Sequence, residues 1–343
     1  MTNKKNKFIM SIIVPFYNSK NVFIKSLKSL SAVADKNIQI ILIDDGSLDS
    51  SYKLAKSFCK KIQNCKLIKL SKNFGPGYAR NQGIKISEGK YIFFLDADDK
   101  INIINFRHLK NIIIKKDYDL IAFDFENKCR KLNKKNRFDF NKINSNKNQL
   151  LKNFLRGEID GSVIFTCFKK RVITDNKIKF PNMLHEDIIF IFKCLYYAKS
   201  IKKLYKKLYI KMDTKNSITG LSSEKRLFDL IKGFSLTKKF ALKKMNTKNT
   251  YIHYARGLNG IIAHIIKNIL NNNKFDYKKK LRMFDQLLKI YNNELKIFKN
   301  LKLNLIGKKT IKDRITEYFI KEFKKKRGKD IIKELNSYTN TIG

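Results

Sequence analysis

Short apolar runs alternate with segments of helical periodicity in the first part of the chain, up to about Phe125. The apolar runs are almost continuous, which is typical of strands buried on both faces of a sheet. They are Phe8–Val14, Ile38–Ile43, Lys66–Leu70, Tyr91–Leu95 and Tyr118–Phe123. The segments with helical spacing are Asn21–Ala34, Ser50–Ile62, Gly77–Ser87 and Ile103–Lys116. This alternation predicts an α/β fold with a doubly wound, mainly parallel sheet and helices on both faces.

The pattern changes after this first region. Residues 126–148 are polar, rich in lysine and asparagine and without a clear period, so we interpret them as a loop or an inserted, mobile segment. Apolar patterning resumes near Leu150 and continues to Tyr209. Lysine-rich amphipathic helices are predicted beyond it, at Ser222–Lys244, Thr250–Leu270, Lys278–Phe298 and Thr310–Leu335. We therefore expect regions at residues 1–125, 126–220 and 221–343, the last being a basic, helical C-terminal region.

The chain is strongly basic, with 75 Lys and Arg residues against 29 Asp and Glu residues and a formal net charge of +46. Such a charge attracts polyanions, namely nucleic acid, anionic lipid headgroups or phosphorylated substrates. Lysine shares A/T-rich codons with isoleucine and asparagine, which are also abundant. Compositional drift on solvated surfaces is therefore an equal explanation of the charge.

The cysteines and the N-terminus indicate the compartment. The 5 cysteines are odd in number and contain no C-x-x-C pair, which argues against a disulfide framework and a zinc knuckle. The apolar run that leads into Pro15 is too short for a signal peptide, and no stretch approaches the length of a membrane span. These features predict a cytoplasmic protein whose thiols are mostly small core hydrophobes.

Two carboxylate clusters and a glycine turn are among the segments that follow the ends of four predicted strands, where ligands bind in an open parallel sheet. These segments are Pro15–Asn18 after the first strand, Asp44–Ser47 after the second, Asn73–Asn81 after the third and Asp96–Asp99 after the fourth. Two carboxylates as close as those of Asp96 and Asp98 repel each other unless a cation lies between them. Mg²⁺ and Mn²⁺ bind one or two carboxylates together with substrate phosphates. The alternative is that Asp98 and Asp99 cap the following helix.

The chain resembles the family 2 glycosyltransferases of the GT-A fold. The matching text is SIIVPFYNS (Ser11–Ser19), IQIILIDDGSLDSS (Ile38–Ser51), NFGPGYARNQGI (Asn73–Ile84), GKYIFFLDADD (Gly89–Asp99) and FPNMLHEDIIF (Phe180–Phe190). The first four motifs stand in the family's order and at its spacing. The resemblance covers Ser11 to about Gly220. It implies a nucleotide-sugar-binding half at residues 1–125 and an acceptor-binding half, with the catalytic base, at residues 126–220.

The resemblance implies a set of donor-binding residues at the strand ends. They are Pro15, Tyr17, Asn18, Asp45, Arg80, Asp96 and Asp98. Pro15, Tyr17 and Asp45 line the base pocket in this interpretation, and Asp45 accepts a hydrogen bond from the uracil N3–H. Arg80 contacts the nucleotide or the sugar, and Asp96 holds the ribose or the sugar. Asp98 binds the divalent metal, Mn²⁺ or Mg²⁺, that bridges the diphosphate.

The family places its catalytic base in the pair Glu186–Asp187. We expect Asp187 to be the base, with Glu186 as the second choice; the alternative is that the pair stabilises a helix N-terminus. The family often has an arginine after this helix, but the segment Tyr209–Gly220 contains none. The expected contacts to the diphosphate are therefore Lys215, Asn216 and Ser217.

The predicted activity is inverting transfer of a hexose or N-acetylhexosamine from a nucleotide-sugar, preferably a UDP-sugar, to a hydroxyl of a glycan. A lipid-linked acceptor in surface glycan synthesis (lipo-oligosaccharide, capsule or protein glycan) fits the resemblance. A sugar nucleotidyltransferase is the first alternative, but Pro15–Ser19 lacks the glycine and basic residues of its phosphate loop. The second is a nucleic-acid-binding protein, which the aspartates at the strand ends disfavour. We therefore expect no nucleic-acid partner.

The basic segments Lys202–Lys211 and Lys321–Lys329 place lysines near aromatic residues. As amphipathic helices they are predicted to lie on an anionic membrane surface, which would make the protein peripheral on the inner face of the cytoplasmic membrane. Solvated helix faces are the equal alternative. The sequence carries no signal for an oligomeric state.

Overall fold

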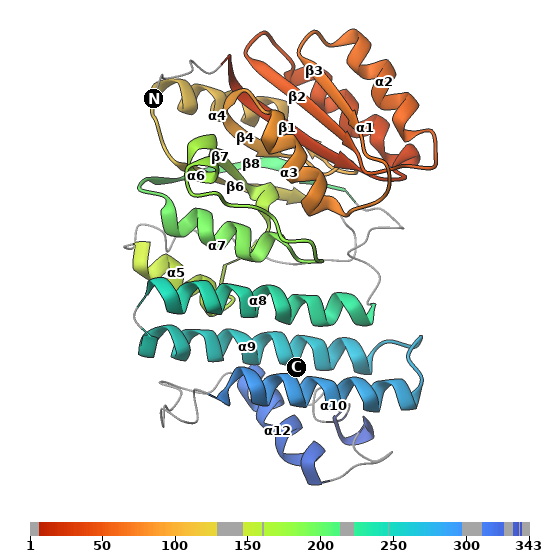
Figure 1. The fold of residues 1–343 in the computed structure, drawn as a ribbon, viewed down its shortest axis with the longest axis vertical. Helices are drawn as coiled ribbons and strands as arrows, with labels where there is room; N and C mark the ends of the chain where they lie inside the picture. Colours follow the sequence, from red (N-terminus) through yellow and green to blue (C-terminus); the bar gives the residue numbers. More distant parts are fainter. Residues whose placement is uncertain are drawn as a thin grey trace. The chain divides into compact units, whose positions relative to one another are not determined.

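The chain forms two compact units in a computed structural model (Figure 1). One comprises Met1–Lys147 and Gly161–Gly220, and the other comprises Asn148–Asp160 and Leu221–Gly343. The structure describes residues 7–128, 147–159, 161–212, 223–245, 247–296, 311–325, 332–335 and 337. The division of the first 220 residues into a nucleotide-sugar-binding half (residues 1–125) and an acceptor-binding half (residues 126–220) stays a prediction.

The first unit is built on an eight-stranded sheet with the strand order β3-β2-β1-β4-β7-β6-β8-β5. Its strands are β1 (Phe8–Phe16), β2 (Ile38–Asp44), β3 (Cys65–Lys69), β4 (Gly89–Phe94), β5 (Lys100–Ile101), β6 (Leu120–Asn127), β7 (Thr166–Lys169) and β8 (Ile201–Lys211). Strands β3, β2, β1 and β4 are parallel neighbours, and β6 is parallel to β8. Among the described strands, β7 runs antiparallel to β4 and β6, and the short β5 runs antiparallel to β8. The sheet is therefore mainly parallel.

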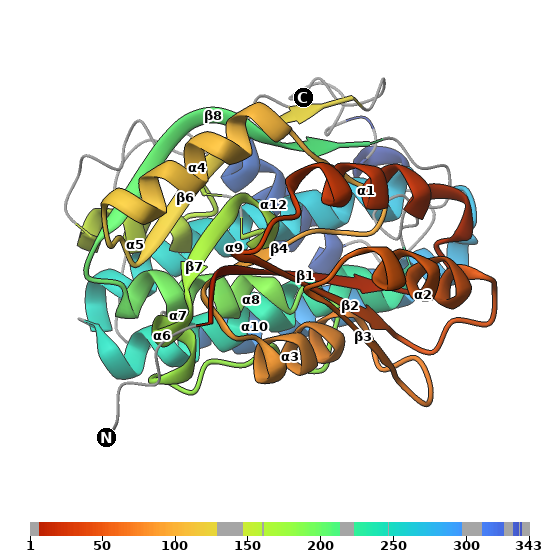
Figure 2. The ribbon, with the colours of Figure 1, turned by 90° about the horizontal axis from the view of Figure 1, so that it is seen from above.

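Helices cover both faces of this sheet. They are α1 (Lys20–Val33), α2 (Ser51–Lys61), α3 (Pro76–Ile86), α4 (Ile103–Lys115), α6 (Lys170–Thr174) and α7 (Asp187–Tyr197), with a 3₁₀ turn, η2, at Val163–Phe165. Figure 2 shows α1 and α4 on one face, with α3 on the opposite face. The predicted α/β fold with a mainly parallel sheet is thus confirmed, together with a C-terminal helical region.

Two strands differ from the sequence prediction. Strand β3 was expected to be buried on both faces, but its residues are exposed or half-buried because it lies at the edge of the sheet. The prediction of an amphipathic helix at Lys202–Lys211 is wrong, because these residues belong to β8. Lys203, Leu204, Leu208 and Tyr209 are buried in this strand, whereas Tyr205–Lys207 are exposed.

The cysteine prediction is corrected in part. Cys59 at the end of α2 and Cys65 at the start of β3 form a disulfide, although the cysteine pattern argues against a disulfide framework. The six-residue separation brings them together because α2 turns directly into the neighbouring strand. Cys167 and Cys194 are free and buried, as expected of small core hydrophobes. Cys129 lies outside the described residues.

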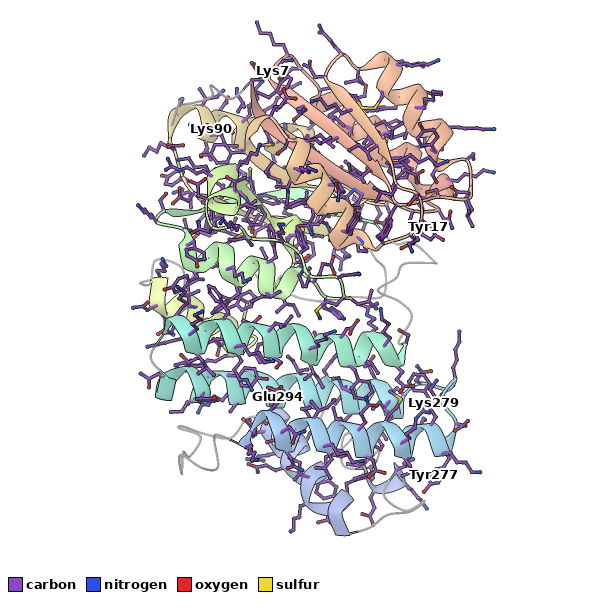
Figure 3. All side chains as sticks on the ribbon, viewed as in Figure 1. Lys7, Tyr17, Lys90, Tyr277, Lys279 and Glu294 are labelled. Carbon is purple, nitrogen blue, oxygen red and sulfur yellow. A yellow bond between two sulfur atoms is a disulfide. The ribbon has the colours of Figure 1, made fainter. Side chains whose placement is uncertain are left out.

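The second unit is helical. Its helices are α5 (Lys147–Leu155), α8 (Glu224–Lys244), α9 (Thr247–Leu270), α10 (Tyr277–Glu294) and α12 (Ile311–Lys325). The first residue of α5, Lys147, belongs to the first unit. Glu294 (Figure 3) accepts hydrogen bonds from Ser235, Lys238 and Tyr254, so three polar groups of α8 and α9 converge on the end of α10. In the described part of the chain, every helix is too short or too polar to cross a bilayer.

The core of the first unit joins β4 to the chain around α7. Phe94 is fully buried at the end of β4, and its ring packs edge-on against Phe168, Phe180 and Phe190. The rings of Phe180 and Phe190 stack on each other with their centroids 3.8 Å apart. This aromatic cluster fixes the end of β4 relative to the start of α7.

We expect Phe94→Ala to lower the free energy of unfolding of the first unit by about 3–5 kcal/mol, since it leaves a cavity in this cluster. Chemical denaturation followed by circular dichroism measures the change. Leu48→Ala, at a side chain that is 89% exposed, is the control and should change stability by about 0.5 kcal/mol at most. Equal effects of the two substitutions would contradict the role of the cluster.

Candidate functional site

The loop after β2 is held to the loop before α3 by one carboxylate. Asp45 is buried, and its two oxygens accept hydrogen bonds from the backbone N–H groups of Phe74 (2.9 Å) and Gly75 (2.8 Å). Burial raises the pKa of Asp45 above its ordinary value and the two N–H donors act against this rise. Gly75 has a φ of 93°, a backbone conformation that glycine adopts without strain.

The loop after β1 is tied to the same region. The Asn18 N–H donates to Ser47 Oγ (3.0 Å), and the Asn18 side chain accepts from the Leu48 N–H (2.9 Å). Pro15 is buried in β1 opposite Ile43 of β2. Tyr17, labelled in Figure 3, follows the strand and is 39% exposed. The carboxyl ends of β1 and β2 therefore present an exposed aromatic ring beside the buried Asp45.

A buried arginine joins two acidic segments that are far apart in the sequence. The Arg80 guanidinium on α3 donates to Glu186 Oε1 (2.6 Å) and to Asp96 Oδ1 (2.9 Å). The side chains of Arg80 and Glu186 are only 8% and 6% exposed, and that of Asp96 is 32% exposed. The ion pair with this cation offsets part of the cost of burying the Glu186 carboxylate, and removing either partner would leave a buried charge unpaired.

The backbone around this arginine allows the close approach. A Cβ atom at Gly77 would lie 2.7 Å from Glu186 Cγ, so a larger residue there would displace the glutamate. The Asn81 side chain accepts from the Phe180 N–H (3.0 Å) and donates to the Phe180 carbonyl (2.9 Å). Helix α3 is thus bound to the chain that leads into α7.

The electrostatics of the cluster follow from its burial. Burial lowers the pKa of Arg80, but the carboxylates of Asp96, Glu186 and Asp187 outweigh this effect and raise the pKa above its ordinary value. Burial raises the pKa of Glu186, and Arg80 counters the rise. Arg80 is therefore a permanent cation at physiological pH, and its charge favours the ionised form of the glutamate.

Three carboxylates converge in the turn after β4. The carboxylate oxygens of Asp96, Asp98 and Asp99 lie within 4.8 Å of one another. Burial, followed by Asp98 and Asp96, raises the pKa of Asp99. Hard oxygen ligands at this spacing, with mutual repulsion that a cation would relieve, fit Mg²⁺ or Mn²⁺. Among the described residues, these three aspartates are the only group of three or more His, Cys, Asp or Glu side chains that lie close enough together to hold a metal ion.

Tyr209 of β8 braces this turn. Its hydroxyl donates to Asp99 Oδ2 (2.6 Å) and accepts from the Asp96 N–H (3.2 Å). Asp99 Oδ1 also accepts from the Met212 N–H (2.8 Å). Tyr209 is fully buried, so these bonds are made in a site of low dielectric. The orientation of the acidic turn therefore depends on the last residues of β8.

Glu186 and Asp187 lie at the start of α7. Glu186 is its N-cap and Asp187 is its first residue. The preceding His185 has a φ of 57°, an uncommon conformation for a residue with a side chain, and such positions concentrate at functional sites. The acidic pair therefore lies at a helix N-terminus, which agrees with the alternative that it stabilises the helix. It also lies beside Arg80 and Asp96.

The structure brings most of the predicted residues to one edge of the sheet. Asp96, Arg80 and Glu186 form one network, and Asp45 and Asn18 stabilise the neighbouring loops. Lys215, Asn216 and Ser217 lie outside the described residues. The sequence interpretation overlooked Tyr209, which had been assigned to a helix, and the pairing of Asn81 with Phe180. Asn81 belongs to the motif Asn73–Ile84, but nothing in the sequence around it indicates that it pairs with Phe180.

Comparisons with known proteins place these features in a family. The family described as glycosyl transferase family 2 matches residues 11–173. An uncharacterized glycosyltransferase of Haemophilus influenzae is 31% identical over 196 residues, which are 55% of this chain and 73% of that protein. The poly(ribitol-phosphate) beta-glucosyltransferase of Bacillus spizizenii is 29% identical over 204 residues, which are 56% of this chain and 30% of that protein. The chain spans about a third or less of the length of several curated relatives that it matches.

Solved structures share the fold. A crystal structure of residues 1–349 of TarS from S. aureus, in complex with UDP-GlcNAc, matches with a TM-score of 0.70 and 19% identity. The match covers 97% of this chain and 90% of that one. The TarS likeness supports the GT-A type of sheet together with a C-terminal helical region.

We expect Tyr209→Phe to weaken Mn²⁺ binding by about 10–100-fold, because removing a group that orients metal ligands has effects of this size. It should also lower the free energy of unfolding by about 1–3 kcal/mol, since the buried Asp99 loses a donor. Calorimetric titration with Mn²⁺ and thermal melting measure the two effects. Tyr205→Phe, at a 58% exposed tyrosine on the same strand, is the control. Unchanged Mn²⁺ binding in Tyr209→Phe would show that the tyrosine does not position the carboxylates.

Proposed function

Because the chain belongs to glycosyltransferase family 2, we propose that it is an inverting enzyme that moves a sugar from a UDP-sugar to a hydroxyl of a glycan. The observation that carries the proposal is the network of Arg80, Asp96 and Glu186 at the carboxyl edge of the sheet. It unites the acidic turn after β4 with the acidic pair at the start of α7, which are the places for the donor diphosphate and the acceptor hydroxyl.

The donor site lies at the ends of β1 and β2. Tyr17 offers an exposed ring for the base, and Asp45 offers carboxylate lone pairs beyond those that accept from Phe74 and Gly75. The complex of TarS with UDP-GlcNAc supports a UDP-sugar as the donor and an N-acetylhexosamine as the sugar. The Bacillus relative named as a glucosyltransferase supports a hexose instead. Lys215, Asn216 and Ser217 remain the proposed contacts to the diphosphate.

Asp98 is the proposed ligand of a divalent cation, with Asp96 and Asp99 beside it. Mn²⁺ or Mg²⁺ at this position would neutralise the charge that develops on the departing nucleoside diphosphate. The residues of the chain hold the acidic turn in place, because Asp96 is fixed by Arg80 and the turn is fixed by Tyr209. Precise positioning of reacting groups contributes to rate in its own right.

Asp187 is the proposed catalytic base. Glu186 is buried and accepts a charge-assisted bond from Arg80, so its role is to hold the guanidinium. The Asp187 carboxylate takes the proton of the acceptor hydroxyl while that oxygen bonds to the anomeric carbon. The bond from this carbon to the diphosphate oxygen breaks in the same displacement, so the configuration inverts.

The acceptor is proposed to be a glycan or polyol polymer of the cell surface, carried on a lipid. The Bacillus relative named for poly(ribitol-phosphate) supports an acceptor with phosphodiester groups, and the net charge of +46 is complementary to such a polymer. We propose that the enzyme works on the cytoplasmic side, in peripheral contact with an anionic membrane.

We expect Asp187→Asn to reduce turnover by about 10²–10⁴-fold, since it removes general-base catalysis, while UDP binding is unchanged. Asp98→Ala should lose the part of UDP-sugar binding that depends on Mn²⁺. The measurements are UDP release from UDP-glucose and UDP-N-acetylglucosamine, with poly(ribitol phosphate) as the test acceptor, and UDP binding by calorimetry.

Asp175→Asn is the matched control, because this aspartate is exposed at the end of α6. It should behave as the unsubstituted protein. Full turnover in Asp187→Asn, with turnover lost in Glu186→Gln, would move the base to Glu186. Release of pyrophosphate from a nucleoside triphosphate and a sugar phosphate, without sugar transfer, would replace the proposed function with a nucleotidyltransferase.

A further inference from the structure

One surface of the first unit exposes large apolar side chains that have no role in the candidate site. They belong to α1, α4 and β8, and they are Ile24 (49% exposed), Ile104 (68%), Ile114 (59%) and Tyr205 (58%). Removing such side chains from water is favourable, so their exposure on neighbouring elements needs an explanation. Among the described residues, the other large exposed apolar side chains are Tyr17, Leu48 and Tyr78, which lie in or beside the loops of the candidate site.

The three elements form one continuous surface. Helix α4 contacts both α1 and β8, and Figure 2 shows α4 beside each of them. The Asn105 side chain donates to the Lys207 carbonyl (3.0 Å), and the Asn102 N–H donates to the Leu208 carbonyl (2.8 Å). Along α4, the exposed residues recur at helical spacing, so they form a stripe: Ile104, Arg107, His108, Asn111, Ile114 and Lys115.

Positive charge predominates on the three elements of this surface, and Lys110 of α4 pairs with an acidic residue, Asp35, which follows α1. The sequences of α1, α4 and β8 contain no aspartate or glutamate. Their exposed basic residues are Lys20, Lys25, Lys28, Arg107, Lys115, Lys202, Lys206 and Lys207. Strand β8 also has extra residues relative to β6 between Leu204 and Lys207, and this irregularity falls where Tyr205 and Lys206 are exposed.

We propose that this surface, the basic–apolar face of α1, α4 and β8, docks on an anionic lipid membrane. Lysines and arginines are attracted to anionic headgroups, and isoleucine and tyrosine side chains enter the boundary between headgroups and acyl chains. The combination of both kinds of side chain on one surface is what such an interface requires. The proposed function includes contact with a membrane, and this proposal assigns that contact to a particular surface. It rests on the proposed function only for the reason why the protein would bind a membrane.

The apolar side chains favour a lipid surface over the other partners of a cationic face. A nucleic acid or another polyanion would pair with the lysines, but it would bury neither Ile104 nor Ile114 in an apolar environment. A second copy of the chain would bring the same positive charges together, and like charges repel. A membrane with anionic headgroups satisfies both sets of side chains.

The face also begins at the candidate site. Helix α1 starts at Lys20, directly after the loop that contains Tyr17 and Asn18, and α4 starts at Ile103, four residues after Asp99. The N-terminal ends of both helices therefore lie at the carboxyl edge of the sheet. Docking through their outer surface would hold this edge beside the membrane, where a lipid-carried acceptor is found.

The test is co-sedimentation of the full chain with vesicles of phosphatidylglycerol and phosphatidylcholine in equal parts, and with vesicles of phosphatidylcholine alone. We expect binding to the anionic vesicles only, with a loss of affinity at high salt. Ile104→Ser with Ile114→Ser should weaken binding by about tenfold or more, although the charge is unchanged. Lys206→Gln with Lys207→Gln should weaken it by a similar factor.

Matched controls separate this face from the total charge of the protein. Asn111→Ser changes an exposed polar residue between the two isoleucines and should bind as the unsubstituted chain. Lys85→Gln with Lys177→Gln removes two exposed lysines on α3 and after α6 and should have little effect. Thermal melting confirms that each variant is folded.

Three results would overturn the proposal. The first is equal vesicle binding by the isoleucine pair variant and the unsubstituted chain, which would show that the apolar side chains do not enter the membrane. The second is an equal loss in the Lys85 and Lys177 control, which would show that only net charge matters. The third is no binding to anionic vesicles at all. If vesicle binding is absent but UDP binding is present, the docking proposal fails and the proposed function stands. If UDP binding is absent but vesicle binding is present, the proposed function fails and the docking proposal stands.

Discussion

The candidate site depends on the buried guanidinium of Arg80, which binds Asp96 on one side and Glu186 on the other. These carboxylates come from segments 16 and 106 residues away from the arginine. Without the cation they would be like charges in a poorly solvated space, and the two segments would repel each other. Gly77, the Asn81–Phe180 pair and the phenylalanine cluster around Phe94 all serve to make this close approach.

This constraint divides the acidic residues by role. Glu186 and Asp96 are held by Arg80, so each has a fixed orientation before a ligand arrives. The turn that contains Asp98 is fixed from its other side by Tyr209 through Asp99 and the Asp96 backbone. Such preorganisation is what a transferase requires, because the donor diphosphate and the acceptor hydroxyl must be aligned for an in-line displacement.

The sequence predicts the parts of the fold that local patterns determine. The parallel strands β1, β2 and β4 and the helices α1–α4 were predicted within a few residues, since each has a strong period and a turn after it. For β8 the sequence predicts a helix, on the ground that lysines lie near aromatic residues. The residues are a strand whose buried Leu204 and Leu208 are four apart, as in a helix, because the strand has extra residues between them. The partners of Arg80, Tyr209 and Cys59 could not be predicted, because they depend on long-range packing or on a turn that has no sequence signature.

A double-mutant cycle on Arg80 and Glu186 tests the central role of the ion pair most directly. Arg80→Met, Glu186→Gln and the double variant would be compared by chemical denaturation, with the stabilisation by UDP and Mn²⁺ as a second readout. The account predicts that Arg80→Met alone costs about 3–5 kcal/mol, since it leaves a buried carboxylate without its cation, and that Glu186→Gln in the same chain recovers about 1–3 kcal/mol of it. Additive effects of the two substitutions, with the response to UDP unchanged in Arg80→Met, would contradict it.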